Sequence, residues 1–450
     1  MAPHPQFQAK PVMNEQLSNP QPGYRERARF ALDHGDEMVA EQSFLHLLDA
    51  EPGDAEALQY LAMRHLVRGE VGKAIERLLA AHRAHLRDAG VLHQLGSARM
   101  AGADYAGAVV DLRDALALAP QMFVARLRLG LALEQLGQSH DALVAYYGAI
   151  HAAQTQGRWL GDANTAPGMR DAVKHAMRYV DAGRHDLFDG ILEPLRERYG
   201  RSELRRVEHC LAIYLHEQPA NLPDPRQQPK FLYFPGIPSQ PYYPRERFPE
   251  FEALEAGTAA IREELRAVLE QPRDLEAFLK VESSQDAGTM LRASGTQQAA
   301  WDAYFFYRHG QRYDTHCASC PQTTALIERM PLSRIREHGP ETLFSVLRPG
   351  THILPHRGVT NTRLVTHLPL IVPPDCALNV GGEIHEWQEG RCVTFDDTFE
   401  HEAWNRSGET RVVLIMDCWN PDLSEAERAA LAELVAGIGD FNRSCDLPGD

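Results

Sequence analysis

Small and apolar positions recur along the first third of the chain at a fixed spacing of 34 residues. The spacing relates alanines, leucines and glycines: Ala40, Ala74, Ala108 and Ala142; Leu61, Leu95 and Leu129; Gly35, Gly69 and Gly137, with Ala103 in the remaining slot. Alanines let paired helices approach closely, and leucines fill the seam between neighbouring pairs. The pattern therefore predicts a stack of helix pairs rather than a generic helical bundle, because a bundle would not need several positions to keep one period.

A repeat of this length with a glycine between its helices is typical of tetratricopeptide repeats. We expect residues 1–24, rich in Pro, Gln and Asn, to be a flexible tail, and residues 25–155 to form a solenoid of three to four repeats. Residues 156–222 are predicted to be a helical cap and connector. Such a solenoid offers a concave surface to a peptide or protein partner, although a structural brace would be built in the same way.

The hydrophobic pattern changes after the proline-rich run from Ala220 to Lys230. Residues 248–279 keep a helical period, and from Trp301 to Trp419 short apolar segments alternate as strands do, separated by Pro, Gly and Asp turns. Residues 424–438 predict a last helix with Ser424 as its N-cap. The fold class is therefore α+β and multidomain, with an all-α solenoid followed by a β-rich domain over residues 223–450.

Composition narrows the function classes. A formal charge of -16 argues against nucleic-acid binding, which requires a basic face. We find no signal peptide and no apolar run near the roughly 18 residues that a membrane span needs. Seven thinly spread cysteines favour a reducing compartment, and Cys317 and Cys320 lack the second pair expected of a zinc site. We expect a soluble, cytoplasmic protein without membrane or nucleic-acid partners.

Two histidines and an arginine carry the candidate chemistry. His401 follows His356 by 45 residues, and Arg411 follows His401 by ten, all within the strand-like region. Neutral imidazoles suit Fe(II), and a two-histidine site with open positions fits O2 chemistry. A guanidinium one strand further on is able to hold a dicarboxylate cosubstrate through two hydrogen bonds. This layout indicates an oxygenase that uses Fe(II), 2-oxoglutarate and O2.

Alternatives remain open at this site. Two residues after His356, where many iron oxygenases carry a carboxylate ligand, this chain has Gly358. Water would complete such a site in a hydroxylase, and chloride would do so in an iron halogenase. Arg411 lies beside the apolar run V-V-L-I-M, where a buried charge needs a partner. That partner is either a bound carboxylate or one of Asp396 and Asp397, which otherwise hold the turn before His401 or its ring.

The region from about Phe231 to Pro421 resembles the aspartyl/asparaginyl β-hydroxylase family. The resemblance rests on F-P-G-I-P-S-Q-P-Y-Y, W-D-A-Y-F-F-Y-R-H-G-Q-R, P-H-R-G, F-D-D-T-F-E-H-E-A-W and D-C-W-N-P-D-L. It implies a double-stranded β-helix (cupin- or jelly-roll-like) domain preceded, as in animal members, by tetratricopeptide-like repeats. The roles it implies are Fe(II) ligation by His356 and His401, binding of the distal carboxylate of 2-oxoglutarate by Ser345 and Arg411, lining of the cosubstrate site by His367 and Trp301, and a catalytic contact to substrate by Arg363.

The resemblance also implies a substrate, the β-carbon of Asp or Asn residues in a protein or peptide that the repeats recruit. His367, taken alone, would be a satisfied core histidine. Animal members carry an arginine that grips the substrate carboxylate where this chain has Val365, so the peptide substrate is open. Other bacterial relatives act on lipid acyl chains, which leaves a lipid or small-molecule substrate as an alternative. A further alternative is an inactive scaffold in which only the repeats function.

Overall fold

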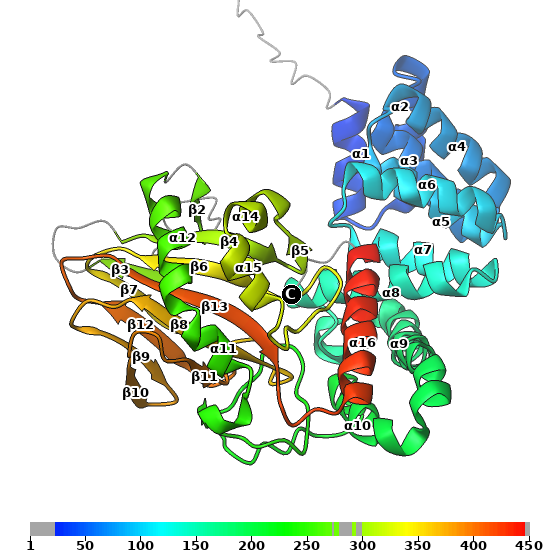
Figure 1. The fold of residues 1–450 in the computed structure, drawn as a ribbon. Coiled ribbons are helices and arrows are strands. Elements are labelled where there is room, and N and C mark those ends of the chain that lie inside the picture. The colour runs from blue at the N-terminus through cyan, green and yellow to red at the C-terminus, as the bar shows by residue number, and fades with distance from the viewer. Residues whose placement is uncertain (1–22, 272–273, 279–289, 294–298, 446–450) are drawn as a thin grey trace, which may run out of the picture. The chain divides into compact units, whose positions relative to one another are not determined.

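The computed structural model describes residues 23–271, 274–278, 290–293 and 299–445 (Figure 1). The chain divides into two compact units, Met1–Met177 and Arg178–Asp450. Helix α9 (Arg170–Tyr199) continues across this division, and the boundaries at residues 155 and 222 remain predictions. The predicted tail lies outside the described residues except for its last two positions.

The first unit is built from helices that pack in consecutive pairs. They are α1 (Tyr24–Asp33), α2 (Glu37–Ala50), α3 (Ala55–Val67), α4 (Val71–Ala84), α5 (Ala89–Ala101), α6 (Tyr105–Leu118), α7 (Phe123–Gln135) and α8 (Ser139–Thr155). Short 3-10 turns at Asp162–Asn164 and Pro167–Met169 lead into α9. The predicted helical repeats are confirmed as four helix pairs within the described residues.

The 34-residue period maps onto equivalent places in these pairs. The four periodic alanines lie on the second helix of each pair and are fully buried, since all have 0% exposure. The periodic glycines turn the chain between the helices with φ of +75°, +75° and +72° at Gly35, Gly69 and Gly137. Ala103 adopts the same left-handed conformation, with φ of 60°, in the slot that lacks glycine. Small residues therefore recur where helices cross and where the backbone turns sharply.

After the end of α9, the second unit continues with short helices and irregular chain. A 3-10 turn (Arg201–Leu204) precedes α10 (Arg205–Tyr214), and the segment rich in proline and aromatic residues has no long regular element before β1 (Tyr242–Tyr243). After a 3-10 turn at Arg245–Arg247 come α11 (Phe251–Ala256) and α12 (Thr258–Glu270). The helix predicted over residues 248–279 is wrong in its last part, because Pro272 follows α12 and β2 (Glu276–Ala277) joins a sheet.

Two antiparallel sheets form the β-rich part of this unit. The larger has the strand order β1-β11-β8-β13-β6-β4-β2, with β5 (Gln311–Arg312) paired to β4, and the smaller has the order β10-β9-β12-β7-β3. Larger-sheet strands not yet given are β4 (Trp301–Arg308), β6 (Thr342–Leu347), β8 (Arg363–Ile371), β11 (Val393–Phe395) and β13 (Arg411–Trp419). Those of the smaller sheet are β3 (Leu291–Ala293), β7 (Thr351–His356), β9 (Cys376–Val380), β10 (Glu383–Glu386) and β12 (His401–Asn405).

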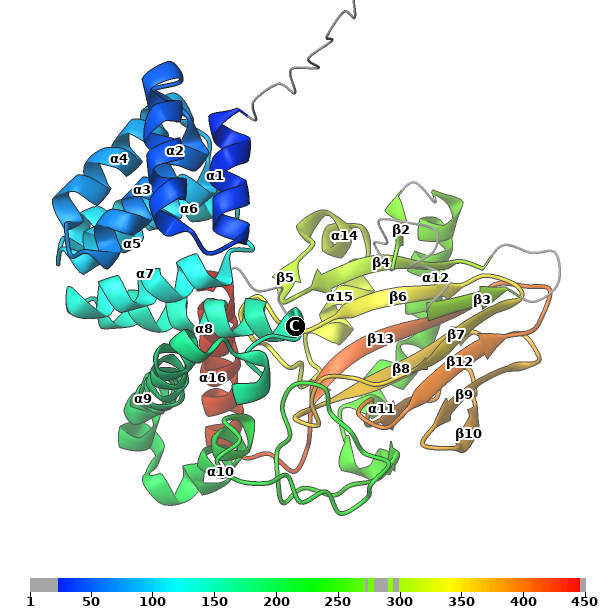
Figure 2. The same cartoon turned by 180° about the vertical axis from the view of Figure 1, so that it is seen from behind.

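The larger sheet is buried on both faces. On β13, Val412, Leu414 and Met416 belong to a core that also contains Ile261 and Leu265 of α12. Figure 1 shows α11 and α12 lying across this face, and Figure 2 shows the sheets from the opposite side. The alternate residues of β13 point into a cavity between the two sheets. Burial on both sides explains why this strand is an almost unbroken apolar run in the sequence.

Two helices interrupt the region predicted to be all strand. α14 (Asp314–Ser319) and α15 (Pro321–Ile327) follow β5, with Pro321 at the first helical position. Cys317 and Cys320 are buried free thiols there and pack in the core beneath α12. The last helix, α16 (Glu425–Ser444), begins with the predicted capping box on Ser424. Among the described helices, none is both long and apolar enough to cross a bilayer.

Candidate active site

The two histidines face each other across neighbouring strands of the smaller sheet. His356 ends β7 and His401 begins β12, where they form an antiparallel register pair with ring centroids 4.0 Å apart. From this pair to the next, Ile353 opposite Ala403, β7 advances three residues and β12 only two. This bulge turns both His356 and Ile353 toward the cavity, although strict alternation would place them on opposite faces.

Both imidazoles are neutral and are held in a fixed tautomer. His356 Nδ1 lies 2.9 Å from the Leu354 carbonyl oxygen, and His401 Nδ1 lies 3.1 Å from that of Phe399. A carbonyl only accepts hydrogen bonds, so each Nδ1 carries the proton and each Nε2 keeps its lone pair. Burial lowers the pKa of both histidines to about 4, which keeps the rings neutral at physiological pH.

Gly358 makes room for a carboxylate beside this pair. A Cβ atom on Gly358 would lie only 2.1 Å from Cγ of Asp397, and the Gly358 N–H donates to the Asp397 carbonyl at 2.6 Å. Asp397 Oδ1 is buried without a hydrogen-bond partner, and burial raises the pKa of this carboxyl. In the described part of the chain, no three His, Cys, Asp or Glu side chains converge as a metal cluster. The cavity therefore brings together two histidines, with the Asp397 carboxyl adjacent.

Asp396 has the structural role predicted for it. Its carboxylate accepts from the Thr398 N–H at 2.9 Å and from the Thr398 hydroxyl at 2.5 Å, which holds the turn before His401. It also accepts from Gln227 Nε2 at 2.7 Å. These contacts engage Asp396 away from Arg411.

The other end of the cavity holds a buried cation that pairs with no anion in the described part of the chain. Arg411 is 1% exposed, its Nε has no hydrogen-bond partner, and burial lowers its pKa to about 10. Its Nη1 donates to Ser345 Oγ at 3.3 Å, and its guanidinium carbon lies 4.7 Å from the centroid of the Trp387 ring. Trp301 Nε1 donates to the same Ser345 oxygen at 2.9 Å. Neither Asp396 nor Asp397 pairs with Arg411, so the alternative of a structural ion pair finds no support among the described residues.

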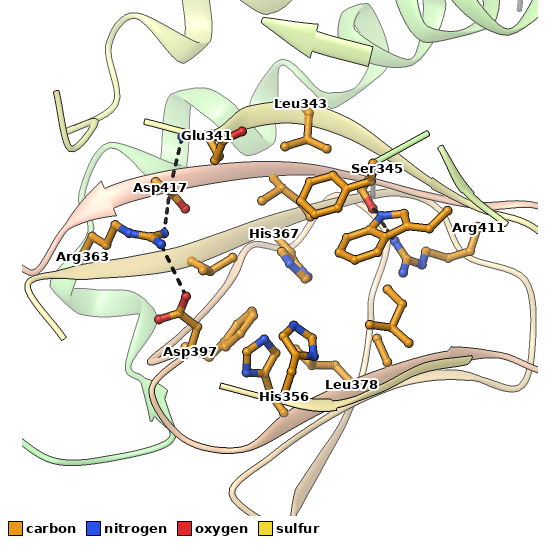
Figure 3. Close-up of a pocket in the computed structure, with 18 residues that line it drawn as sticks. Glu341, Leu343, Ser345, His356, Arg363, His367, Leu378, Asp397, Arg411 and Asp417 are labelled. Atoms are coloured by element: carbon orange, nitrogen blue, oxygen red, sulfur yellow. Dashed lines mark hydrogen bonds and ion pairs between the residues drawn. The ribbon is translucent and has the colours of Figure 1, made fainter. Parts of the chain in front are cut away.

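His367 is buried in the cavity wall between these two ends (Figure 3). Its ring meets the edge of Phe395, with centroids 5.1 Å apart, and its Nδ1 has no hydrogen-bond partner. Burial, followed by the charge of Arg411, lowers its pKa well below the ordinary value. A purely structural core histidine would have its buried nitrogen satisfied. The orphaned nitrogen favours a contact to a bound molecule.

Arg363 lies in the same cavity but is already paired. Its Nη1 is 2.7 Å from Asp417 Oδ2, and its Nη2 is 3.8 Å from Asp397 Oδ2. Figure 3 shows this guanidinium between the two carboxylates, far from Arg411 along the sheet. The predicted contact between Arg363 and substrate remains a prediction, and in this structure the side chain links two acids.

All seven predicted site residues line one cavity of about 180 Å³: Trp301, Ser345, His356, Arg363, His367, His401 and Arg411. The sequence reasoning missed most of the apolar wall, including Phe278, Leu343, Ile353, Leu378, Phe395 and Ile415, and two acids, Glu341 and Asp417. Asp417 lies an even number of residues after Arg411 on β13, so both side chains point to the same face, and strand alternation would have identified Asp417. Trp387, whose ring lies against the Arg411 guanidinium, belongs to no recognisable motif and was missed as well.

The C-terminal half of the chain, which contains this cavity, is similar to known proteins. Residues 255–421 match the family model described as Aspartyl/Asparaginyl beta-hydroxylase. Aspartate beta-hydroxylase domain-containing protein 2 of Rattus norvegicus is 32% identical over 251 residues, which are 54% of this chain and 69% of that protein. Ornithine lipid ester-linked acyl 2-hydroxylase of Rhizobium tropici is 35% identical over 199 residues, 43% of this chain and 66% of that protein.

Aspartyl/asparaginyl beta-hydroxylase of Homo sapiens is 33% identical over 200 residues, 44% of this chain and 25% of that protein. A crystal structure of MamA is 26% identical with a TM-score of 0.27, covering 34% of this chain and 90% of that one. The chain thus spans from 25% to 69% of the length of these curated hydroxylase relatives. The chain belongs to the aspartyl/asparaginyl β-hydroxylase family.

Proposed function

We propose that this protein is an Fe(II)- and 2-oxoglutarate-dependent hydroxylase whose active site is the cavity between the two sheets. The observation that carries the proposal is the buried guanidinium of Arg411, for which the described residues provide no anionic partner. An uncompensated charge in a protein interior is costly unless a ligand supplies its partner. The carboxylate of a dicarboxylic acid is such a ligand, and a histidine pair in the same cavity would receive the metal.

The residues present fit both groups. His356 and His401 would hold Fe(II) through Nε2, because their Nδ1 atoms face carbonyl oxygens. Ser345 Oγ accepts from both Trp301 and Arg411, so its own O–H is free to donate to a carboxylate beside the guanidinium. The pocket thus offers a carboxylate one hydroxyl donor and one bidentate cation.

When bound, iron, 2-oxoglutarate and O2 supply the oxidising power that replaces an unactivated C–H bond by C–OH. The chain binds and orients the reactants and keeps water out with the apolar wall of the cavity. Asp397 fills the space next to Gly358, and its negative charge would oppose chloride there. Hydroxylation is therefore better supported than halogenation.

The substrate prediction comes from the relatives. The human relative is named for aspartyl and asparaginyl residues and the Rhizobium tropici relative for a lipid acyl chain, so the family's names span two substrate classes. The name of the human relative leads to the first substrate proposal, an Asp or Asn residue of a protein or peptide that the helical repeats recruit.

The test is formation of succinate from 2-oxoglutarate by the purified chain with Fe(II), ascorbate and O2, together with Fe(II) stoichiometry. His401→Gln is expected to lose both metal and succinate. His352→Gln is the matched control, because His352 lies on the same strand as His356, bonds Glu402 at 2.7 Å and does not line the cavity. If the wild-type protein binds neither Fe(II) nor 2-oxoglutarate, the proposed hydroxylase is refuted, and the alternative of an inactive scaffold in which only the repeats function is favoured.

A further inference from the structure

The first helices of successive pairs form one face of the solenoid in the first unit. Helix α5 lies against α3 on one side and against α7 on the other. Among the described helices, the second members of the pairs, α4, α6 and α8, make no comparable contact with one another. Helices on the inner side of a curved stack approach each other most closely. The face built by α3, α5 and α7 is therefore the concave face of the repeats.

A cluster of three polar side chains joins two helices of this face. Arg128 on α7 donates through Nη1 to His93 Nε2 at 2.7 Å and to the Ser97 hydroxyl oxygen, both on α5. Ser97 donates its own proton to the His93 carbonyl oxygen at 2.6 Å, so toward Arg128 it is only an acceptor. His93 and Ser97 lie one turn apart, on the side of α5 opposite the buried Leu95. The half-buried cluster therefore belongs to the concave face and not to the core between the helices.

The guanidinium of this cluster meets only neutral groups. An imidazole lone pair and a hydroxyl oxygen accept hydrogen bonds but carry no negative charge. Burial lowers the pKa of Arg128, and no carboxylate among the described residues acts on it in the opposite direction. Nη1 is occupied, whereas Nε and Nη2 donate to no group in the described part of the chain. These two nitrogens carry the parallel N–H donors that bind a carboxylate through two hydrogen bonds.

Exposed apolar side chains lie beside the cluster on the same face. Met63 of α3 precedes Ser97 by one 34-residue period, so the two residues hold equivalent positions on neighbouring first helices. Met63 is 47% exposed, and Val67, one turn further along α3, is 74% exposed. Apolar surface next to a cation without an anion is complementary to a chain that carries both an apolar and an acidic side chain.

We propose that the concave face of the repeats binds an acidic peptide, whose Asp or Glu carboxylate is held by Nε and Nη2 of Arg128. His93 and Ser97 position the guanidinium for this contact. One carboxylate matches the single charge, whereas a nucleic acid would require a broad basic face, which the formal charge of -16 argues against. The proposal concerns a docking contact in the first unit. It does not depend on the proposed function of the second unit, and the docked carboxylate is not the group that is oxidised.

Selection from a random peptide library tests the proposal without a known partner. The full-length protein is used to select from a phage library of 12-residue peptides, in parallel with Arg128→Gln and with Arg113→Gln. Arg113 is the control, because it lies on the second helix α6, is exposed and pairs with Asp141 at 3.5 Å. Peptides selected by wild type and by Arg113→Gln are expected to be enriched in Asp and Glu relative to those selected by Arg128→Gln. No selected peptide, no acidic enrichment, or an enrichment that Arg128→Gln retains overturns the proposal.

Calorimetry on one synthetic peptide then measures the contact itself. The peptide most enriched by wild type is made with its Asp or Glu and with the corresponding Asn or Gln. Wild type is expected to bind the acidic form at least about tenfold more tightly, and Arg128→Gln to bind both forms with the same weak affinity. The difference in wild type should shrink as salt screens the charges. Equal affinities of wild type for the two peptides overturn the proposal, and this comparison needs no change in the protein, so it holds even if Arg128→Gln is poorly folded.

Discussion

Replacing Arg411 by methionine separates a ligand-binding arginine from a structural one. Methionine is of similar length and fills the buried space without charge. If Arg411 were held by a protein anion, its removal would leave that anion buried and unpaired, at a cost of roughly 3–5 kcal/mol. Among the residues that the structure describes, no such anion pairs with Arg411, because Asp396 bonds Thr398 and Gln227 and Asp397 faces Arg363. We therefore expect the ligand-free variant to fold at least as stably as wild type.

The magnitude follows from the surroundings of the guanidinium. Lowering of the Arg411 pKa from 12.5 to about 10 by burial corresponds to roughly 3 kcal/mol of unfavourable free energy in the ligand-free protein. The hydrogen bond to Ser345 and the contact with the Trp387 ring return about 1 kcal/mol each. Arg411→Met should therefore raise the free energy of unfolding by about 1 kcal/mol, a rise in Tm of roughly 2–4 °C for a unit of this size.

Binding should change in the opposite direction. A carboxylate without its bidentate cation loses roughly 3–5 kcal/mol, so the Kd for 2-oxoglutarate should rise by about 10²-fold or more. Calorimetric titration and thermal melts with and without 2-oxoglutarate measure both quantities. Arg348→Met is the control, because Arg348 is exposed and pairs with Asp302 at 2.8 Å. Near-wild-type affinity in Arg411→Met, or a loss of several kcal/mol in its ligand-free stability, would refute the reasoning.

Substitutions elsewhere test the histidine site, the repeats and the last helix. Gly358→Ala should displace the Asp397 carboxylate, because a Cβ at this position would meet it at 2.1 Å. Metal titration should then show an Fe(II) affinity about tenfold lower or more. Gly408→Ala is the control: its Cβ meets nothing within 4 Å, so the Fe(II) affinity should not change. Burial, followed by the charge of Arg128, lowers the pKa of His93 to about 4. The first unit should therefore lose stability as the pH falls from about 6.5 to 4. In thermal melts over this pH range, the stability of His93→Gln should depend less on pH than that of wild type. Ser424→Ala removes the capping box and should cost about 1 kcal/mol in denaturant unfolding, and an unchanged midpoint would contradict the cap.

The repeat and strand patterns could be predicted from the sequence because they follow from local geometry. A side chain on a helix or strand returns to the same face at a fixed spacing, so Ala74 and Leu95 mark buried faces without knowledge of their neighbours. The capping box at Ser424 is equally local, since its partners lie within four residues. The interruption by α14 and α15 was missed because their apolar residues are as suitable for a strand as for a short helix.

The candidate site is predictable only in part. The motifs place His356, His401 and Arg411, and all three do line one cavity. Their motifs do not reveal that a bulge between β7 and β12 aims His356 inward, nor that Asp417 neutralises Arg363. Both facts depend on which residue of a distant strand lies opposite, and that register is set by the whole sheet.

The sequence by itself determined the 34-residue repeat, most of the helices and strands, and the family, and it singled out His356, His401 and Arg411 as candidates, because each depends on residue kind and spacing along the chain. The tertiary structure alone decided which charges are already satisfied. Arg411 is buried and Arg363 partly buried, both on inward strand positions, and only packing shows that Arg363 is paired with an acid while Arg411 has no anionic partner among the described residues. Electrostatic pairing depends on distances of a few ångströms between strands that are far apart in sequence, and those distances exist only after the sheets have formed.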